Sequence, residues 1–323
     1  SELVETVEDP VARSLWSFLG PLPPHWSGRF DQALAVIQRW RPAAQSSGNA
    51  TMVLGNRWVE ALARGARGDF EPALALLHEI VDEAKRIGEM LVWARAVNTI
   101  GWVHGELQDH EQALEWSRRG VEAAQEIDAP DFEVEGNARV NVGDALFALG
   151  RLEEAEEQYK AVERVARDPS PADRFMLWRY SQHLYHSYGE LWLARGAPEK
   201  ALAYAEGCLA LASESDSRKN IVKGRRLRGE ALLAQGKLDE AEGEFHAALG
   251  VAQQIGNPTQ LWKTHGALGR LHAAQGRAKD AGDAYGQALA VIEGVAAGVH
   301  DEGLRAALLA SQQTQAIRWA AQR

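Results

Sequence analysis

Apolar residues recur at helical spacing along almost the whole chain, and a glycine interrupts them at regular intervals. Around Gly150, for example, Val142 and Leu146 precede the glycine, and Ala155 and Tyr159 follow it. Apolar residues three or four positions apart form one face of a helix. Glycine takes the left-handed conformation that ends a helix. The segment is therefore predicted to be a helix, a tight turn and a second helix.

The same unit recurs at intervals of about 40 residues. The turn positions are Gly28, Gly68, Gln108, Gly150, Gly196, Gly236 and Gly276. An alanine follows each turn five residues later, at Ala33, Ala73, Ala113, Ala155, Ala201, Ala241 and Ala281. Such a period marks arrays in which each unit buries its apolar face only against its neighbours. The pattern predicts an all-α solenoid of helix-turn-helix repeats.

A second small residue stands seven positions before most of the turns. These residues are Ala61, Gly101, Gly143, Gly189, Gly229 and Gly269. A glycine inside a helix costs roughly 1 kcal/mol relative to alanine. Its recurrence therefore indicates that a neighbouring helix comes too close for a side chain. Aromatic residues nine positions after the turns, at Tyr159, Phe245 and Tyr285, are expected to fill the space between units.

The two ends differ from the repeated part, so three regions are expected. Residues 1–27 are predicted to hold a short helix capped by Asp9 and then a rigid proline-rich loop, PLPPHW. Residues 28–297 form the array. Residues 298–323 are predicted to hold one final helix, over 301–321, that covers the last apolar face, as terminal repeats require.

Charge and composition limit the functions that fit this chain. It has 323 residues and a formal net charge of −10, which disfavours non-specific attraction to nucleic acid or to an anionic membrane. No apolar run approaches the ~20 residues needed to cross a bilayer. The single cysteine, Cys208, excludes an intramolecular disulfide and favours a cytoplasmic location; it is expected to be an inert core thiol. The start lacks both Met and a signal peptide, so we expect a piece of a longer protein.

The small residue, turn glycine, alanine and aromatic in these registers resemble the tetratricopeptide repeat (TPR). The usual unit has about 34 residues, whereas these have about 40. The longer version is similar to repeats of MalT-like regulators and of the C-terminal regions of bacterial signalling ATPases (STAND or AAA-type) and nucleotide cyclases. The resemblance covers about residues 28–297. It implies a right-handed superhelix with a concave groove, and it is specific for fold rather than for function.

The resemblance also implies which residues face the groove, at three positions before each turn. In the N-terminal part they are Trp58, Arg95, Asn98, Trp102, Asn137 and Asp144. In the C-terminal part they are His183, His186, Glu190, Lys223, Arg226, Glu230, Lys263 and Arg270. The groove is thus expected to have an aromatic and amide half and a basic half. Repeats of this family bind protein or peptide segments.

Several of these residues allow two interpretations. The segment 218–228 carries six cations and no acid, which fits an acidic peptide or a phosphate-bearing effector. Alternatively its cations pair with acidic helices of adjacent repeats, the interpretation favoured for Arg225 and Arg228. Trp58 and Trp102 could anchor a partner or pack between repeats. Asn98 and Asn137 could hold a peptide backbone or form a solvated polar face.

An enzymatic interpretation is weaker. His183, His186 and Glu190 could place two imidazoles and a carboxylate on one helix face, as in a metal site. The sequence offers no evident second shell for that site and no phosphate-binding loop, dinucleotide fingerprint or hydrolase motif. We therefore expect no metal, no cofactor and no catalysis.

The leading hypothesis is a binding module that is the sensor or scaffold arm of a larger bacterial regulatory protein. Its covalently linked partner domain would lie outside this sequence. The alternatives are a free-standing adaptor or self-assembling scaffold, a metal-dependent enzyme, and a nucleic-acid binder through 218–228. The sequence leaves the oligomeric state open.

Overall fold

The computed structural model describes residues 9–127, 132–174 and 176–322, and within these ranges the chain is helical without strands. It begins with α2 (Pro10–Leu19), α3 (Leu22–Trp26) and α4 (Phe30–Ser46). Six helix pairs follow: α5 (Ala50–Arg67) with α6 (Phe70–Ile87), α7 (Met90–Glu106) with α8 (His110–Gln125), α9 (Phe132–Ala148) with α10 (Leu152–Arg167), α11 (Leu177–Ala194) with α12 (Pro198–Glu214), α13 (Arg218–Ala234) with α14 (Leu238–Ile255), and α15 (Pro258–Ala274) with α16 (Ala278–Ala297). The chain ends with α17 (Glu302–Ala310) and α18 (Gln312–Ala321). The predicted all-α solenoid is confirmed.

Each predicted turn residue adopts the left-handed backbone that separates two helices. The φ angles run from 62° at Gln108 to 98° at Gly68, and the other five turn glycines lie between them. Glycine has no Cβ to clash in this conformation, so it adopts it without strain. Gln108 adopts the same conformation with a side chain, which places the turn of the third unit in register with the rest.

The small residues before the turns make room for aromatic rings. A Cβ added at Gly229 would lie 2.5 Å from the ring of Phe245, and one at Gly269 would lie 2.6 Å from Tyr285. Both contacts join the two helices of one repeat. The two sequence registers therefore meet in space, which explains the recurrence of glycine inside helices.

Both ends of the chain differ in part from the sequence prediction. Asp9 caps α2 by accepting a hydrogen bond from the Val11 N–H, as expected. The PLPPHW segment, however, is the short helix α3 rather than a loop, because proline is tolerated in a first helical turn, where its missing N–H has no partner to lose. The single final helix over 301–321 is also wrong, since Ser311 ends α17 and caps α18.

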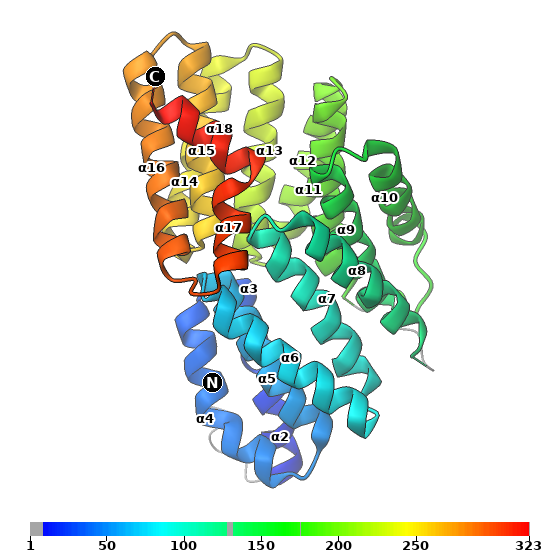
Figure 1. The fold of residues 1–323 in the computed structure, drawn as a ribbon. Helices are drawn as coiled ribbons and strands as arrows, with labels where there is room; N and C mark the ends of the chain where they lie inside the picture. The colour runs from blue at the N-terminus through cyan, green and yellow to red at the C-terminus, as the bar shows by residue number, and fades with distance from the viewer. Residues whose placement is uncertain (1–8, 128–131, 175, 323) are drawn as a thin grey trace.

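The array curls until its first and last repeats touch (Figure 1). Asn257, which precedes α15, donates a hydrogen bond of 2.6 Å to the carbonyl of Ala66 in α5. The His300 N–H donates to Glu71 over 2.7 Å. Beside them, an apolar cluster joins α4 and α5 to α13 and α14 through Phe30, Ala66, Val222, Ala248, Ala252 and Ile255. We call this set of contacts the closure.

The short helix α3 packs against the middle of the array. Its Trp26 lies edge-on to Trp178 of α11, with ring centroids 4.9 Å apart. At the other end, α18 packs against α16. The closure and these end helices convert the concave side of the solenoid into a pocket. None of the described helices is long and apolar enough to span a membrane.

Candidate ligand-binding pocket

The pocket on the concave side has a volume of about 280 Å³ and is partly open to solvent. Helices α7, α9, α11, α13 and α15 supply most of its wall, and α3, α4, α5, α8 and α18 also contribute. Ten of the residues expected in the groove line it: Asn98, Trp102, Asn137, Asp144, His183, His186, Glu190, Lys223, Arg226 and Lys263. The first helices of the pairs thus bring together residues that are far apart in the sequence.

Trp58 and Arg95 do not line this pocket. Trp58 is 3% exposed, its Nε1 donates to Thr99, and Phe18 of α2 packs against its ring. The Arg95 guanidinium lies over the same ring and pairs with the buried Glu133 at 2.7 Å. Packing rather than partner contact accounts for Trp58, because α2 covers this part of the array.

Glu230 and Arg270 also lie outside the pocket. They form an ion pair with each other between α13 and α15. The pair leaves Arg270 half exposed. These two side chains therefore connect adjacent repeats.

The aromatic and amide side of the pocket is a hydrogen-bonded network. Asp144 accepts from the Tyr159 hydroxyl at 2.9 Å and lies 2.8 Å from Nε2 of His183. Burial would raise the pKa of Asp144, but His183 and Lys223 outweigh it and lower the pKa to about 2. Asn141 donates to Asn98 at 2.8 Å. These groups hold one another in place, so this wall is preorganised.

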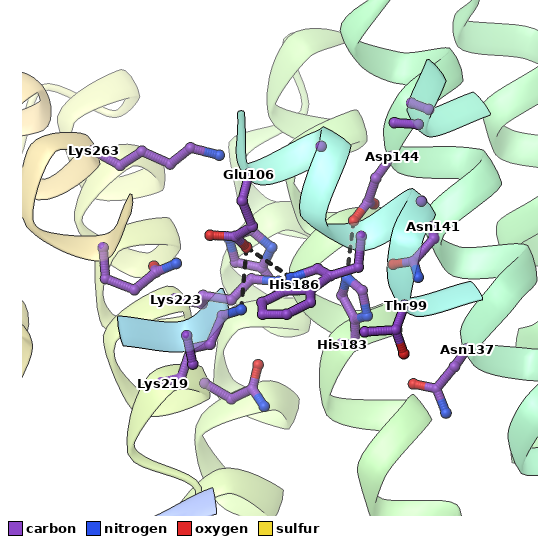
Figure 2. Close-up of a pocket in the computed structure, with 18 of the residues that line it drawn as sticks. Thr99, Glu106, Asn137, Asn141, Asp144, His183, His186, Lys219, Lys223 and Lys263 are labelled. Atoms are coloured by element: carbon purple, nitrogen blue, oxygen red, sulfur yellow. Dashed lines mark hydrogen bonds and ion pairs between the residues drawn. The ribbon is translucent and has the colours of Figure 1, made fainter. Parts of the chain in front are cut away.

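The opposite wall contains an ion pair that sequence reasoning did not identify. Lys219 of α13 donates to Glu106 of α7 at 3.1 Å, across 113 residues of chain. The Glu106 carboxylate also accepts from Trp102 Nε1 at 2.8 Å. Burial would raise its pKa, but Lys219 and Lys263 lower it to about 2. Figure 2 shows Lys219 and Lys263 directed toward Glu106, with Asp144 and His183 on the other side.

Helical spacing could have found both members of this pair. Glu106 lies four residues after Trp102 on α7, and Lys219 lies four residues before Lys223 on α13. Residues at this spacing share a helix face. The family positions omit both because they lie near the helix ends, which meet only where the array closes.

Further cations line the same wall, of which Arg226 is buried and Lys223 and Lys263 are half-buried. Lys223 and Lys263 have no hydrogen-bond or ion-pair partner among the described residues, and Arg226 donates to Gln260 at 2.8 Å. Burial lowers the pKa of Lys223 to about 8 and lowers that of Lys263. Burial raises the pKa of Glu190.

His186 stands between the two walls. It is 4% exposed, and both of its ring nitrogens lack a hydrogen-bond partner in the part of the chain that the structure describes. Its Nδ1 lies 3.5 Å from Glu190. Burial, together with Lys223 and Arg226, keeps its pKa well below the usual value. The imidazole is therefore neutral.

The basic segment 218–228 divides between two environments. Arg225 and Arg228 both pair with Glu244 of α14, at 3.2 and 3.5 Å, as the structural interpretation predicted. Lys219, Lys223 and Arg226 instead face the pocket. The segment thus does not present all its cations on one outer surface, as nucleic-acid binding through it would require.

The two histidines considered as ligands of one metal have different partners. His183 pairs with Asp144, and His186 lies beside Glu190. Within the described ranges, no three His, Cys, Asp or Glu side chains form a set that could hold a metal ion. Cys208 is buried, and burial raises the pKa of its thiol to about 12, so it is a core residue.

Comparison with protein families agrees with this geometry. Residues 94–168 and 220–294 match the family described as tetratricopeptide repeat. These two segments are tetratricopeptide repeats. The matched TPR segments include α7 to α10 and most of α13 to α16, which supply much of the pocket. A comparison with curated protein sequences finds no match.

Solved TPR-like structures share the fold at low sequence identity. A Rap protein complexed with competence and sporulation factor aligns with a TM-score of 0.61 at 14% identity, covering 90% of this chain and 79% of the other. The Rap conjugation gene regulator of plasmid pLS20, in complex with the Phr* peptide, gives 0.55 at 17% identity, covering 84% and 78%. The APC/C hetero-tetramer Cut9–Hcn1 gives 0.57 at 16% identity, covering 97% and 55%. At these identities the likeness establishes the fold alone.

Proposed function

We propose that this TPR protein is a non-catalytic binding module that captures a peptide segment or a small effector in its central pocket. One observation carries the proposal: a pocket of about 280 Å³, lined by polar side chains from five first helices, lies at the centre of the array. Mostly preformed pockets with convergent polar groups are the usual sites of ligand binding. Rap structures of the same fold have been solved in complex with competence and sporulation factor and with a peptide.

We further propose that the module is the sensor or scaffold arm of a larger bacterial regulatory protein. Residues from both ends of the array line the pocket, among them Ala66 of α5 and Lys263 of α15, so a ligand that fills it would contact both ends. In a solenoid, small rotations between repeats add up to a large change of curvature. Ligand capture would thereby alter how the arm packs against a partner domain.

A steric variant tests capture in the pocket without changing its charge. Ala148 lies in the pocket wall, so Ala148→Trp should fill part of the cavity, whereas Ala273→Trp adds the same side chain at an exposed site. Each purified protein would be exposed to lysate of its source organism, and retained peptides and small molecules identified by mass spectrometry. We expect a molecule held by the wild type and by Ala273→Trp and lost by Ala148→Trp. Equal retention by all three would place binding outside the pocket.

A further inference from the structure

The pocket wall gathers positive charge inside an acidic protein. The chain has a formal net charge of −10, yet the wall formed by α13 and α15 presents Lys219, Lys223, Arg226 and Lys263. The carboxylates that face them are Glu106, Asp144 and Glu190. Gathering several half-buried cations without an ion-pair partner for each is unfavourable. The excess of cations therefore indicates a site built for a negatively charged group.

The carboxylates of the pocket offset these cations only in part. Asp144 is held by His183 and Tyr159 on the opposite wall, and Glu190 lies beside His186. Lys223 and Lys263 thus remain without an ion-pair partner among the described residues. Charge-assisted hydrogen bonds to a carboxylate or phosphate are the strong contacts that such ammonium groups make.

Neutral groups beside the cations also lack partners. Both ring nitrogens of His186 and Oε1 of Gln182 are buried without a hydrogen bond within the described part of the chain. Both residues line the pocket. Because buried polar groups are nearly always hydrogen-bonded, these atoms mark contacts that a ligand would complete.

Glu106 places one carboxylate of the protein itself at the edge of this cation cluster. It comes from α7, whereas Lys219 and Lys263 come from α13 and α15 (Figure 2). Its Oε1 accepts from Lys219 and Trp102, while its Oε2 is buried without a hydrogen-bond partner. The pair is one of the contacts that hold the first and last parts of the array together. Glu106 thus stands where an incoming anion would be attracted.

We propose that the cationic wall binds an oxyanion group of the ligand, a phosphate or a carboxylate, between Lys223, Arg226 and Lys263. This group competes with Glu106 for Lys219. The inference rests on the proposed function of the same pocket and names the chemistry of its ligand. Glu106 is then an internal competitor, and binding exchanges a contact within the chain for one with the ligand.

Calorimetric titration with inorganic pyrophosphate and with citrate tests the anion site and separates the two oxyanion types. We expect at least one probe to bind, and Lys223→Gln and Lys263→Gln each to weaken it about tenfold, as for loss of a charge-assisted contact. Lys279→Gln, at an exposed position of α16, is the control and should leave affinity unchanged. Binding of neither probe, or equal affinity in all variants, would overturn the inference. If Ala148→Trp still abolished capture, the proposed function would stand without it.

If Glu106 competes with the ligand, removal of its charge should increase the affinity for the probe rather than decrease it. Glu106→Gln should bind the probe about threefold to tenfold more tightly, and the exposed Glu122→Gln should not. In a Lys219→Gln background the gain should disappear, because the contested cation is gone. Unchanged or weaker binding by Glu106→Gln would refute the competition.

A second measurement needs no substitution. Saturating probe should increase amide hydrogen exchange at the end of α7 in the wild-type protein, because Glu106 loses its partner on α13. Unchanged exchange there in the presence of bound probe would contradict the displacement of Glu106.

Discussion

Lys223 is a half-buried pocket residue that holds its proton less tightly than a lysine in water. Burial and Lys219 together lower its pKa to about 8, against the opposing effect of Asp144 and Glu190. The nearby His183 and His186 have lowered pKa values and are neutral above pH 7. Lys223 is therefore the pocket group that changes charge just above neutral pH.

The affinity for an anion should follow this titration. We expect citrate binding to weaken as the pH rises from about 7 to about 9, because loss of the Lys223 proton removes a positive charge from the site. Lys223→Gln should show a smaller pH dependence, with Lys263, whose pKa is also lowered by burial, accounting for the remainder. Calorimetry across this range checks the prediction. Superimposable profiles for the two proteins would assign the pH effect to another group.

At the scale of the helices, small residues control how closely the two helices of a repeat approach. Gly229→Ala should destabilise the protein by about 1–3 kcal/mol, because the new methyl group would overlap the Phe245 ring. Gly243→Ala, in an exposed part of α14 with no atom nearby, should stabilise it by about 0.5–1 kcal/mol. Chemical denaturation followed by circular dichroism measures both changes. A Gly229→Ala variant as stable as the wild type would disprove the close-approach explanation.

The sequence predicted those elements whose signals are local. Turn glycines and helical apolar spacing depend on residues within one unit, so the helix pairs were found. The proline-rich segment was mistaken for a loop because the same prolines suit a first helical turn. The break at Ser311 was missed because apolar spacing continues across it, through Leu308 and Ile317.

At the scale of the whole molecule, a few contacts between distant repeats hold the array closed. Asn257 makes one such contact and one local contact through different atoms. Its Nδ2 donates to Ala66 across the closure, and its Oδ1 caps α15. Asn257→Asp retains the capping oxygen and places a carboxylate against a carbonyl. We expect a loss of about 1–3 kcal/mol in unfolding free energy and faster hydrogen exchange at the α5–α6 turn.

Asn49→Asp is the matched control for this substitution. Asn49 caps α5 through Oδ1, and it takes no part in the closure. Its replacement should change stability and exchange little. Equal effects of the two substitutions would show that capping, and not the closure, is responsible.

The pocket could be predicted only in part, because some of its contacts join repeats that are far apart in the sequence. Asn98, Lys223 and other wall residues occupy fixed positions in each repeat, so the TPR resemblance located them. Glu106 and Lys219 meet because rotations accumulated over several repeats bring α7 to α13. The covering of Trp58 by α2 likewise depends on how the chain end folds back. No local pattern encodes these long-range approaches.

The closure also restricts how this protein can evolve. Open arrays lengthen or shorten by duplicating or losing a unit, since each repeat contacts only its neighbours. Here one additional repeat of about 40 residues would carry Asn257 away from Ala66 and Lys219 away from Glu106. The closure thereby constrains the number of repeats between Ala66 and Asn257, whereas substitutions in the pocket leave these contacts in place.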